Sequence, residues 1–120
     1  MVMQEQKEYQ LPNLEYVLIN MSKRSKANTK QVKQQLFLKC GRVDMYDMCY
    51  YKDYSLQLHH DPPYHITHHT IYEESYLLSA TNHQELHYLE THNPLEYRNR
   101  MNIIKENKKI LERKQKRISN

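Results

Sequence analysis

Apolar side chains recur with helical spacing soon after a weakly patterned lead-in over residues 1–27. Three of them follow one another at intervals of four and so share one helix face: Val32, Leu36 and Cys40. Asn28 or Thr29 is typical of the residue that begins a helix, and Gly41 stands where a glycine commonly ends one. The pattern predicts a helix over Lys30–Lys39 with one apolar face.

The segment YSLQLHH changes to strict alternation, which predicts a strand. Leu58 and His60 point to one side of this strand, and Gln57 and His59 point to the other. The two prolines that follow cannot continue a ladder of hydrogen bonds, so the strand ends there and a loop runs to Thr70.

A second strand and two helices follow the loop. The segment TIYEESYLLS, residues 70–79, predicts a strand that returns beside the first and contains an early turn. Thr81 or Asn82 would cap the next helix, whose inward side chains are Leu86 and Leu89. Pro94 interrupts the pattern, and a long helix from Leu95 to about Arg117 is predicted after it. The elements together predict a small single α+β domain.

Composition limits the core and the compartment. The 120 residues are 38% hydrophobic, with 11 tyrosines and 1 phenylalanine, and buried tyrosine hydroxyls need hydrogen-bond partners. Cys40 and Cys49 form no set of metal-binding pairs, so we expect buried, reduced thiols. No run approaches the roughly 18 apolar residues of a membrane span. We therefore expect a cytoplasmic protein without a membrane partner.

The last helix combines a basic face with an apolar stripe. Residues 98–117 carry nine lysines and arginines against two glutamates, in a chain of net charge +4. Five of these side chains would suit the phosphates of a nucleic acid, with a merely solvated face as the alternative: Arg98, Lys105, Lys108, Lys109 and Arg113. An apolar stripe recurs every seven residues: Tyr97, Ile104, Leu111 and Ile118. This stripe should pack on the domain, and its far end could pair with a second copy in a homodimer.

Seven of the eight histidines lie between Leu56 and Glu90. His83 and His87 are four residues apart on a predicted helix, so they form a chelating pair on one face. His59 and His60 are adjacent at the end of a strand and point in opposite directions. One of these two could complete a metal site, and the other could take a proton from water.

The segments LHHDPP and YEESYLLSATNHQELH resemble the HNH, or ββα-metal, endonucleases and are most similar to the colicin-type DNases. The resemblance implies an HNH-like ββα-metal domain over residues 28–94, followed by a basic helix over residues 95–120. It implies three metal ligands, namely His59, His83 and His87. It also implies that His60 is the general base.

Two substitutions separate this chain from the family pattern. Glu74 stands where many members have an asparagine that braces the loop of the base, and Gln57 stands where colicin-type members have a glutamate. Asp61 and Glu74 could each orient a histidine, although Asp61 could equally cap the turn before Pro62.

The resemblance implies an endonuclease that hydrolyses DNA phosphodiester bonds with a divalent ion (Mg²⁺, Mn²⁺, Ni²⁺ or Zn²⁺) and is encoded by a phage or mobile element. The first alternative is a catalytically inactive HNH-like module that binds nucleic acid or a host protein, for example as an inhibitor of a bacterial defence system. The second alternative is a protein that zinc stabilises without catalysis.

Overall fold

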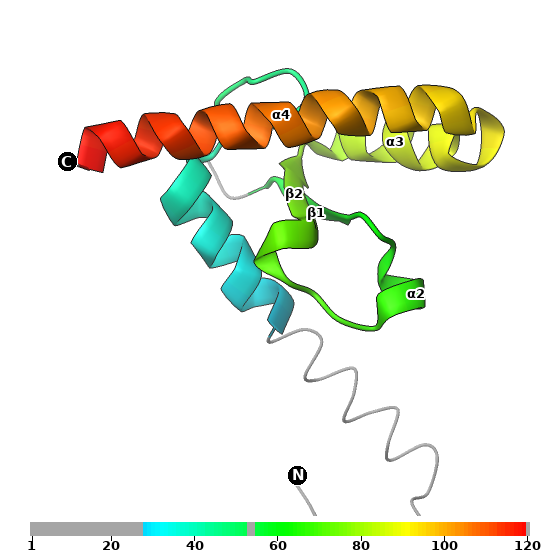
Figure 1. Cartoon of the computed structure of the whole chain (residues 1–120), viewed down its shortest axis with the longest axis horizontal. Helices are drawn as coiled ribbons and strands as arrows, with labels where there is room; N and C mark the ends of the chain where they lie inside the picture. The colour runs from blue at the N-terminus through cyan, green and yellow to red at the C-terminus, as the bar shows by residue number, and fades with distance from the viewer. Residues whose placement is uncertain (1–27, 53–54, 120) are drawn as a thin grey trace, which may run out of the picture.

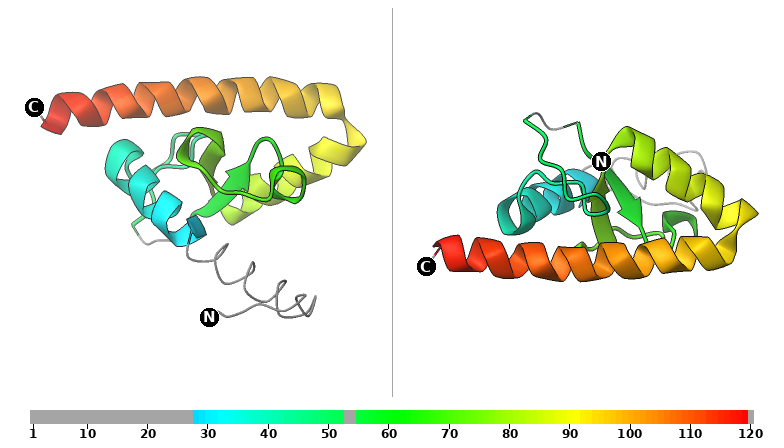
Figure 2. Two further views of the ribbon diagram at one scale, coloured as in Figure 1. Left: turned by 60° about the horizontal axis from the view of Figure 1, so that its bottom comes forward. Right: turned by 90° about the horizontal axis from the view of Figure 1, so that it is seen from above.

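The computed structural model describes residues 28–52 and 55–119, which form an α+β fold. Two short antiparallel strands, β1 (Gln57–His60) and β2 (Ser75–Leu78), lie between helices. The long helix α4 (Pro94–Ser119) runs along one side of the molecule, with α3 (Ala80–His92) beside its first half (Figure 1). Figure 2 shows the helix over residues 28–40 near the second half of α4.

The predicted first helix is confirmed, since residues 28–40 are helical and Val32, Leu36 and Cys40 are buried. Gly41 ends it with a φ of +82°, and its N–H donates to the carbonyl of Phe37. The predicted cap is wrong, because Asn28 and Thr29 are themselves helical.

The strand predicted over the segment YSLQLHH is confirmed at Gln57–His60, which form β1, but the second strand is shorter than predicted. Its early residues form a 3₁₀ turn over Tyr72–Glu74, and only Ser75–Leu78 pair with β1. The reason is that β1 stops at the Asp61–Pro62 bond, so residues 71–74 have no strand to pair with. A short helix, α2 (Tyr64–Thr67), occupies the intervening loop.

Helix α3 begins two or three residues earlier than predicted. Ser79, not Thr81 or Asn82, is the N-cap, because its backbone is extended and its hydroxyl accepts from the N–H of Asn82. As predicted, Leu86 is buried, and Leu89 packs partly against the core. Pro94 begins α4 directly, where its missing N–H costs nothing.

The apolar stripe of α4 packs into the hydrophobic core of its own chain. Tyr97, Met101, Ile104 and Leu111 are all buried and pack with the strands and the other helices. The stripe is therefore occupied as far as Leu111 and is not available there to a second copy. Of the cysteines, Cys40 is buried as expected but Cys49 is exposed, and both are free thiols. No described helix is long and apolar enough to cross a membrane.

A buried carboxylate joins the turn after the first helix to the start of α3. Asp44 is fully buried, and it accepts from the backbone N–H groups of Ser79 (2.7 Å) and Tyr46 (2.7 Å) and from the amide of Asn82 (2.9 Å). Burial alone would raise the pKa of Asp44, but these donors and the Asp47 N–H lower it below its usual value.

We predict that Asp44→Asn lowers the free energy of unfolding by about 2–4 kcal/mol at pH 7. The asparagine would replace one accepting oxygen with an NH₂ group, which would then face the buried N–H groups that Asp44 accepts from. A carboxyl group with a lowered pKa stabilises the fold above its unfolded pKa and stops doing so as the pH falls through the folded value. The difference between wild type and variant should therefore shrink below pH 4. Urea unfolding from pH 7 to pH 2 measures it.

Asp47→Asn is the matched control, because Asp47 lies in the same turn but is exposed. Asp47→Asn should lower the free energy of unfolding by less than about 1 kcal/mol. Equal losses in the two variants would show that the burial of Asp44 is not what stabilises this junction.

Candidate metal centre

Three histidines from two elements converge beside the sheet. His59 comes from β1, and His83 and His87 come from α3, and one ring nitrogen from each lies within 4.8 Å of the others. The ring centres of His83 and His87 are each 5.4 Å from that of His59. The helical repeat brings His83 and His87 together as the spacing predicts, and of the two strand histidines it is His59 that lies beside them, as the resemblance implies.

The orientation of His83 is set by the strand. Its Nδ1 lies 2.8 Å from Oε1 of Gln57, which can only accept, so Nδ1 carries the proton and Nε2 keeps its lone pair. That Nε2 is 3.0 Å from Nε2 of His87. Two nitrogens on one tetrahedral zinc ion, with bonds of about 2.0 Å, would be roughly 3.3 Å apart. The pair is thus nearly at chelating distance.

His59 provides the strongest indication that this group can bind a metal ion. Its side chain is buried, with Nε2 at 2.9 Å from the hydroxyl of Tyr97. Its Nδ1 is buried without any hydrogen-bond partner among the described residues. Buried ring nitrogens are normally satisfied, and a metal ion would satisfy this one. The residues present therefore fit a divalent ion bound through Nδ1 of His59 and Nε2 of His83 and His87.

The protonation of His59 and His83 also suits a metal. Burial, followed by the neighbouring His83 and His87, lowers the pKa of His59 to about 3. Burial, followed by His87 and His60, lowers the pKa of His83 to about 4. Both rings are therefore neutral at physiological pH, and only neutral imidazole binds a metal.

Asp61 is connected to His59 through the hydroxyl of Tyr97 and so helps to orient its ring. The Tyr97 hydroxyl donates to Oδ1 of Asp61 at 3.4 Å and so can accept from His59, which places the proton of His59 on Nε2. Burial raises the pKa of Asp61, but hydrogen bonds and charge from Arg98 and Lys105 lower it overall, and both cations approach Oδ2 at 3.0 Å. Of the alternatives that the sequence leaves open for Asp61, the structure favours the orienting role.

Tyr97 contacts the candidate metal centre, and sequence reasoning missed this contact. Its heptad position made it look like an ordinary core residue, and it is one, being 5% exposed. The signal that could have found it is its hydroxyl, which a buried tyrosine must pair.

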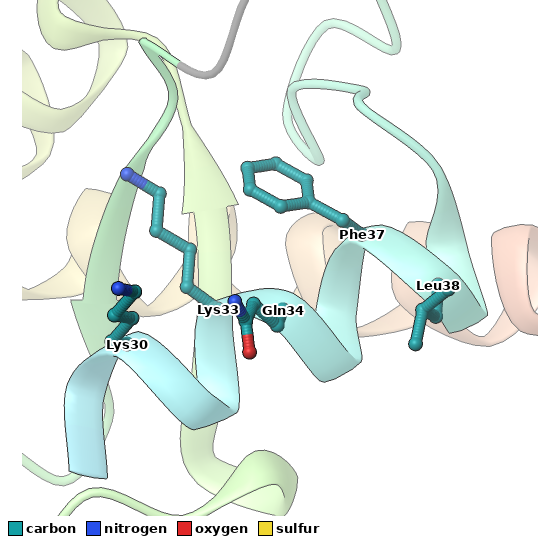
Figure 3. Close-up of a pocket in the computed structure, with 5 residues that line it drawn as sticks. All are labelled: Lys30, Lys33, Gln34, Phe37 and Leu38. Atoms are coloured by element: carbon teal, nitrogen blue, oxygen red, sulfur yellow. The ribbon is translucent and has the colours of Figure 1, made fainter. Parts of the chain in front are cut away.

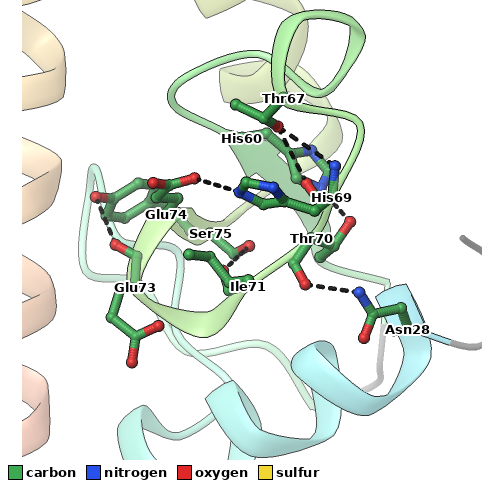
Figure 4. A network of polar contacts seen from close by, with 10 residues as sticks. Asn28, His60, Thr67, His69, Thr70, Ile71, Glu73, Glu74 and Ser75 are labelled. Atoms are coloured by element: carbon green, nitrogen blue, oxygen red, sulfur yellow. Dashed lines mark hydrogen bonds and ion pairs between the residues drawn. The ribbon is translucent and has the colours of Figure 1, made fainter.

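Glu74 does not contact the three histidines. Its carboxylate lies 3.2 Å from Nε2 of His69 in the loop, and its backbone carbonyl accepts from the N–H of Asp61. Glu74 therefore braces the loop rather than a metal-binding side chain (Figure 4).

His60 points away from His59 and lies beside the same centre. It lines a hollow of about 420 Å³ with His83, His87 and Tyr64. Its Nε2 is 3.2 Å from the hydroxyl of Thr70, and burial, followed by the charge of His87, lowers its pKa. The hollow therefore places a histidine outside the candidate ligand group next to two members of that group.

The basic face predicted on α4 is smaller than expected. Arg98 and Lys105 are paired with Asp61, and Lys108 is buried, with Nζ donating to the carbonyls of Tyr72 and Ser75. The prediction that Lys108 binds nucleic acid is therefore wrong, because its ammonium group faces the protein interior. Lys109 and Arg113 are exposed.

A second hollow lies on the first helix, lined by Lys30, Lys33, Gln34, Phe37 and Leu38 (Figure 3). The ammonium of Lys33 is 5.9 Å from the ring of Phe37. None of the histidines lines it, so it is separate from the candidate metal centre.

Comparison with known protein families, curated proteins and solved structures finds no match.

We predict that His83→Ala weakens Zn²⁺ or Ni²⁺ binding at least tenfold and removes most of the thermal stabilisation that excess metal gives, because the ion binds only the folded state. Isothermal calorimetry and thermal unfolding with and without metal measure the two effects. His92→Ala is the control, since His92 lies on α3 but outside the group. Equal affinities in wild type and His83→Ala would rule out His83 as a ligand.

Proposed function

We propose that this protein is a divalent-metal-dependent endonuclease of the HNH type that hydrolyses DNA phosphodiester bonds. The observation that carries the proposal is the unpartnered, buried Nδ1 of His59 next to the chelating pair, with His60 facing the adjoining hollow. A metal site and a nearby neutral base are the minimum equipment for this hydrolysis.

The order of the strands and helices along the chain also supports the proposed endonuclease function. A strand, a loop, a second antiparallel strand and a helix follow one another, with His59 and His60 at the end of β1 and the other two histidines on α3. The departure at Gln57 is compatible with a metal site, because its amide oxygen accepts from His83 and presents that ligand's Nε2.

His60 would remove a proton from the attacking water. Its lowered pKa keeps the ring neutral near pH 7, and it lines the same hollow as His83 and His87, so the base and an ion held by these ligands would face one substrate. An ion held by the three histidines would supply positive charge for the scissile phosphate and the leaving 3′ oxygen. Nitrogen ligands favour Zn²⁺ or Ni²⁺ in affinity, while Mn²⁺ or Mg²⁺ could bind with the help of substrate oxygens.

We predict that His60→Ala lowers the cleavage rate about 10²–10⁴-fold while metal affinity and fold are retained, because only the base is lost. Single-turnover cleavage of plasmid with Mg²⁺, Mn²⁺, Ni²⁺ or Zn²⁺ in excess keeps affinity changes out of the rate. His92→Ala is the control, since His92 is exposed on α3 and lies outside both the group of three histidines and the hollow.

The proposal fails if wild type cleaves no faster than His60→Ala with each of the four metals. A metal-stabilised module that binds nucleic acid or a host defence protein would then be the better description.

We predict that Lys109→Gln/Arg113→Gln flattens the salt dependence of DNA binding by up to about 2 in the slope of log K against log salt, since each lost phosphate contact removes about 0.9. Filter binding from 50 to 300 mM salt measures it. Lys30→Gln/Lys52→Gln removes the same charge from other exposed positions and serves as the control. Identical slopes in the two double variants would show that α4 does not meet DNA.

A further inference from the structure

A histidine that acts as a base needs one ring nitrogen held and the other left unprotonated. The hydrogen bond made by the first nitrogen selects the tautomer and therefore decides which nitrogen is free. For His60 the held nitrogen is Nε2, which lies 3.2 Å from Oγ1 of Thr70. No described residue forms a hydrogen bond with its Nδ1 that would compete for the proton.

Thr70 is itself held rigidly. It is 2% exposed, although threonine is ordinarily a surface residue, and it lies in the loop between α2 and the 3₁₀ turn. Its backbone carbonyl accepts a 2.7 Å hydrogen bond from the side-chain amide of Asn28. Figure 4 shows Asn28 reaching from the first helix to this loop, so a distant element fixes the position of Thr70.

The direction of the hydrogen bond between His60 and Thr70 depends on where the hydroxyl proton of Thr70 points. Oγ1 of Thr70 also lies 3.5 Å from Oγ1 of Thr29. If the single hydroxyl proton of Thr70 points toward Thr29, its oxygen is left to accept from Nε2–H of His60. The proton of His60 is then on Nε2, and the lone pair is on Nδ1.

We propose that Thr70, held by Asn28, is the positioning residue for His60 and makes Nδ1 the nitrogen that accepts the proton of water. The inference rests on the proposed endonuclease function for its catalytic meaning, but the tautomer it specifies is a property of the protein alone. It assigns the bracing of the base to a hydroxyl 10 residues after His60 and to an amide 42 residues before Thr70. The side chain of Glu74 has no part in it, since it pairs with His69.

The test compares Thr70→Val, which keeps the shape but removes the hydroxyl, with Thr70→Ser, which restores it. Thr67→Val is the matched control, because the Thr67 hydroxyl lies in the same loop and bonds only the backbone of His69. The full chain is loaded with Zn²⁺ and labelled with ¹⁵N-histidine, and long-range NMR couplings report the ring tautomer of His60, assigned with a His60→Gln sample. Single-turnover cleavage and Zn²⁺ affinity are measured on the same proteins.

Wild type, Thr70→Ser and Thr67→Val should hold His60 in the Nε2–H tautomer, and Thr70→Val should show a mixture of tautomers. Thr70→Val should cleave about 10–100-fold more slowly at saturating substrate with unchanged Zn²⁺ affinity, while Thr70→Ser stays within about threefold of wild type. If Thr70→Val does not fold, Asn28→Ala, which frees the Thr70 carbonyl and keeps its hydroxyl, should show the same changes in smaller measure.

The inference is overturned if wild type carries the proton on Nδ1, if Thr70→Val keeps the wild-type tautomer, or if Thr67→Val changes tautomer and rate as much as Thr70→Val does. Absence of cleavage in wild type would refute the proposed function instead. The tautomer would then still decide whether Thr70 positions His60.

Discussion

One hydrogen bond, between Nε2 of His59 and the hydroxyl of Tyr97, connects the hydrophobic core to the candidate metal centre. Tyr97 belongs to the buried face of α4, so the packing of that helix determines where its hydroxyl lies. The bond occupies one nitrogen of His59 and leaves Nδ1 as a buried atom without a described partner. Burial of the ring makes such an atom costly, and a bound ion would relieve that cost. The core and the site therefore depend on each other through a single side chain.

Charged groups are turned inward at several places in this small fold. Asp61 pairs with Arg98 and Lys105 in the first half of α4, Asp44 joins the turn after the first helix to the start of α3, and Lys108 donates to the carbonyls of Tyr72 and Ser75. The hydrophobic core is thus supplemented by buried charged groups that have hydrogen-bond partners. The consequence for function is that part of the positive charge of α4 serves the fold, and exposed cations such as Lys109 and Arg113 are left for an anionic partner.

The departures from the family pattern have local physical explanations. Gln57 is neutral, yet its amide oxygen accepts from His83, the interaction needed to present a ligand nitrogen. Glu74 is held by His69, and its backbone meets Asp61 at the end of the strand. The task of bracing His60 falls to Thr70 and Asn28 in our proposal, which uses contacts from the first helix in place of an asparagine in the loop.

Periodicity along the chain predicted the main helices, the first strand and the chelating pair, because a spacing of four places His83 and His87 on one helix face. Alternation placed His59 and His60 on opposite sides of the strand but left open which of them joins the pair. The short second strand, the cap at Ser79 and the exposure of Cys49 required the structure, since each depends on which distant segment lies opposite. Only the tertiary structure could show that Tyr97 holds His59 and that Thr70 meets His60. The hydrogen bond between Tyr97 and His59 joins residues 38 apart and produces no periodic pattern in the sequence. A strand or a helix does produce such a pattern, because its apolar residues recur at regular intervals.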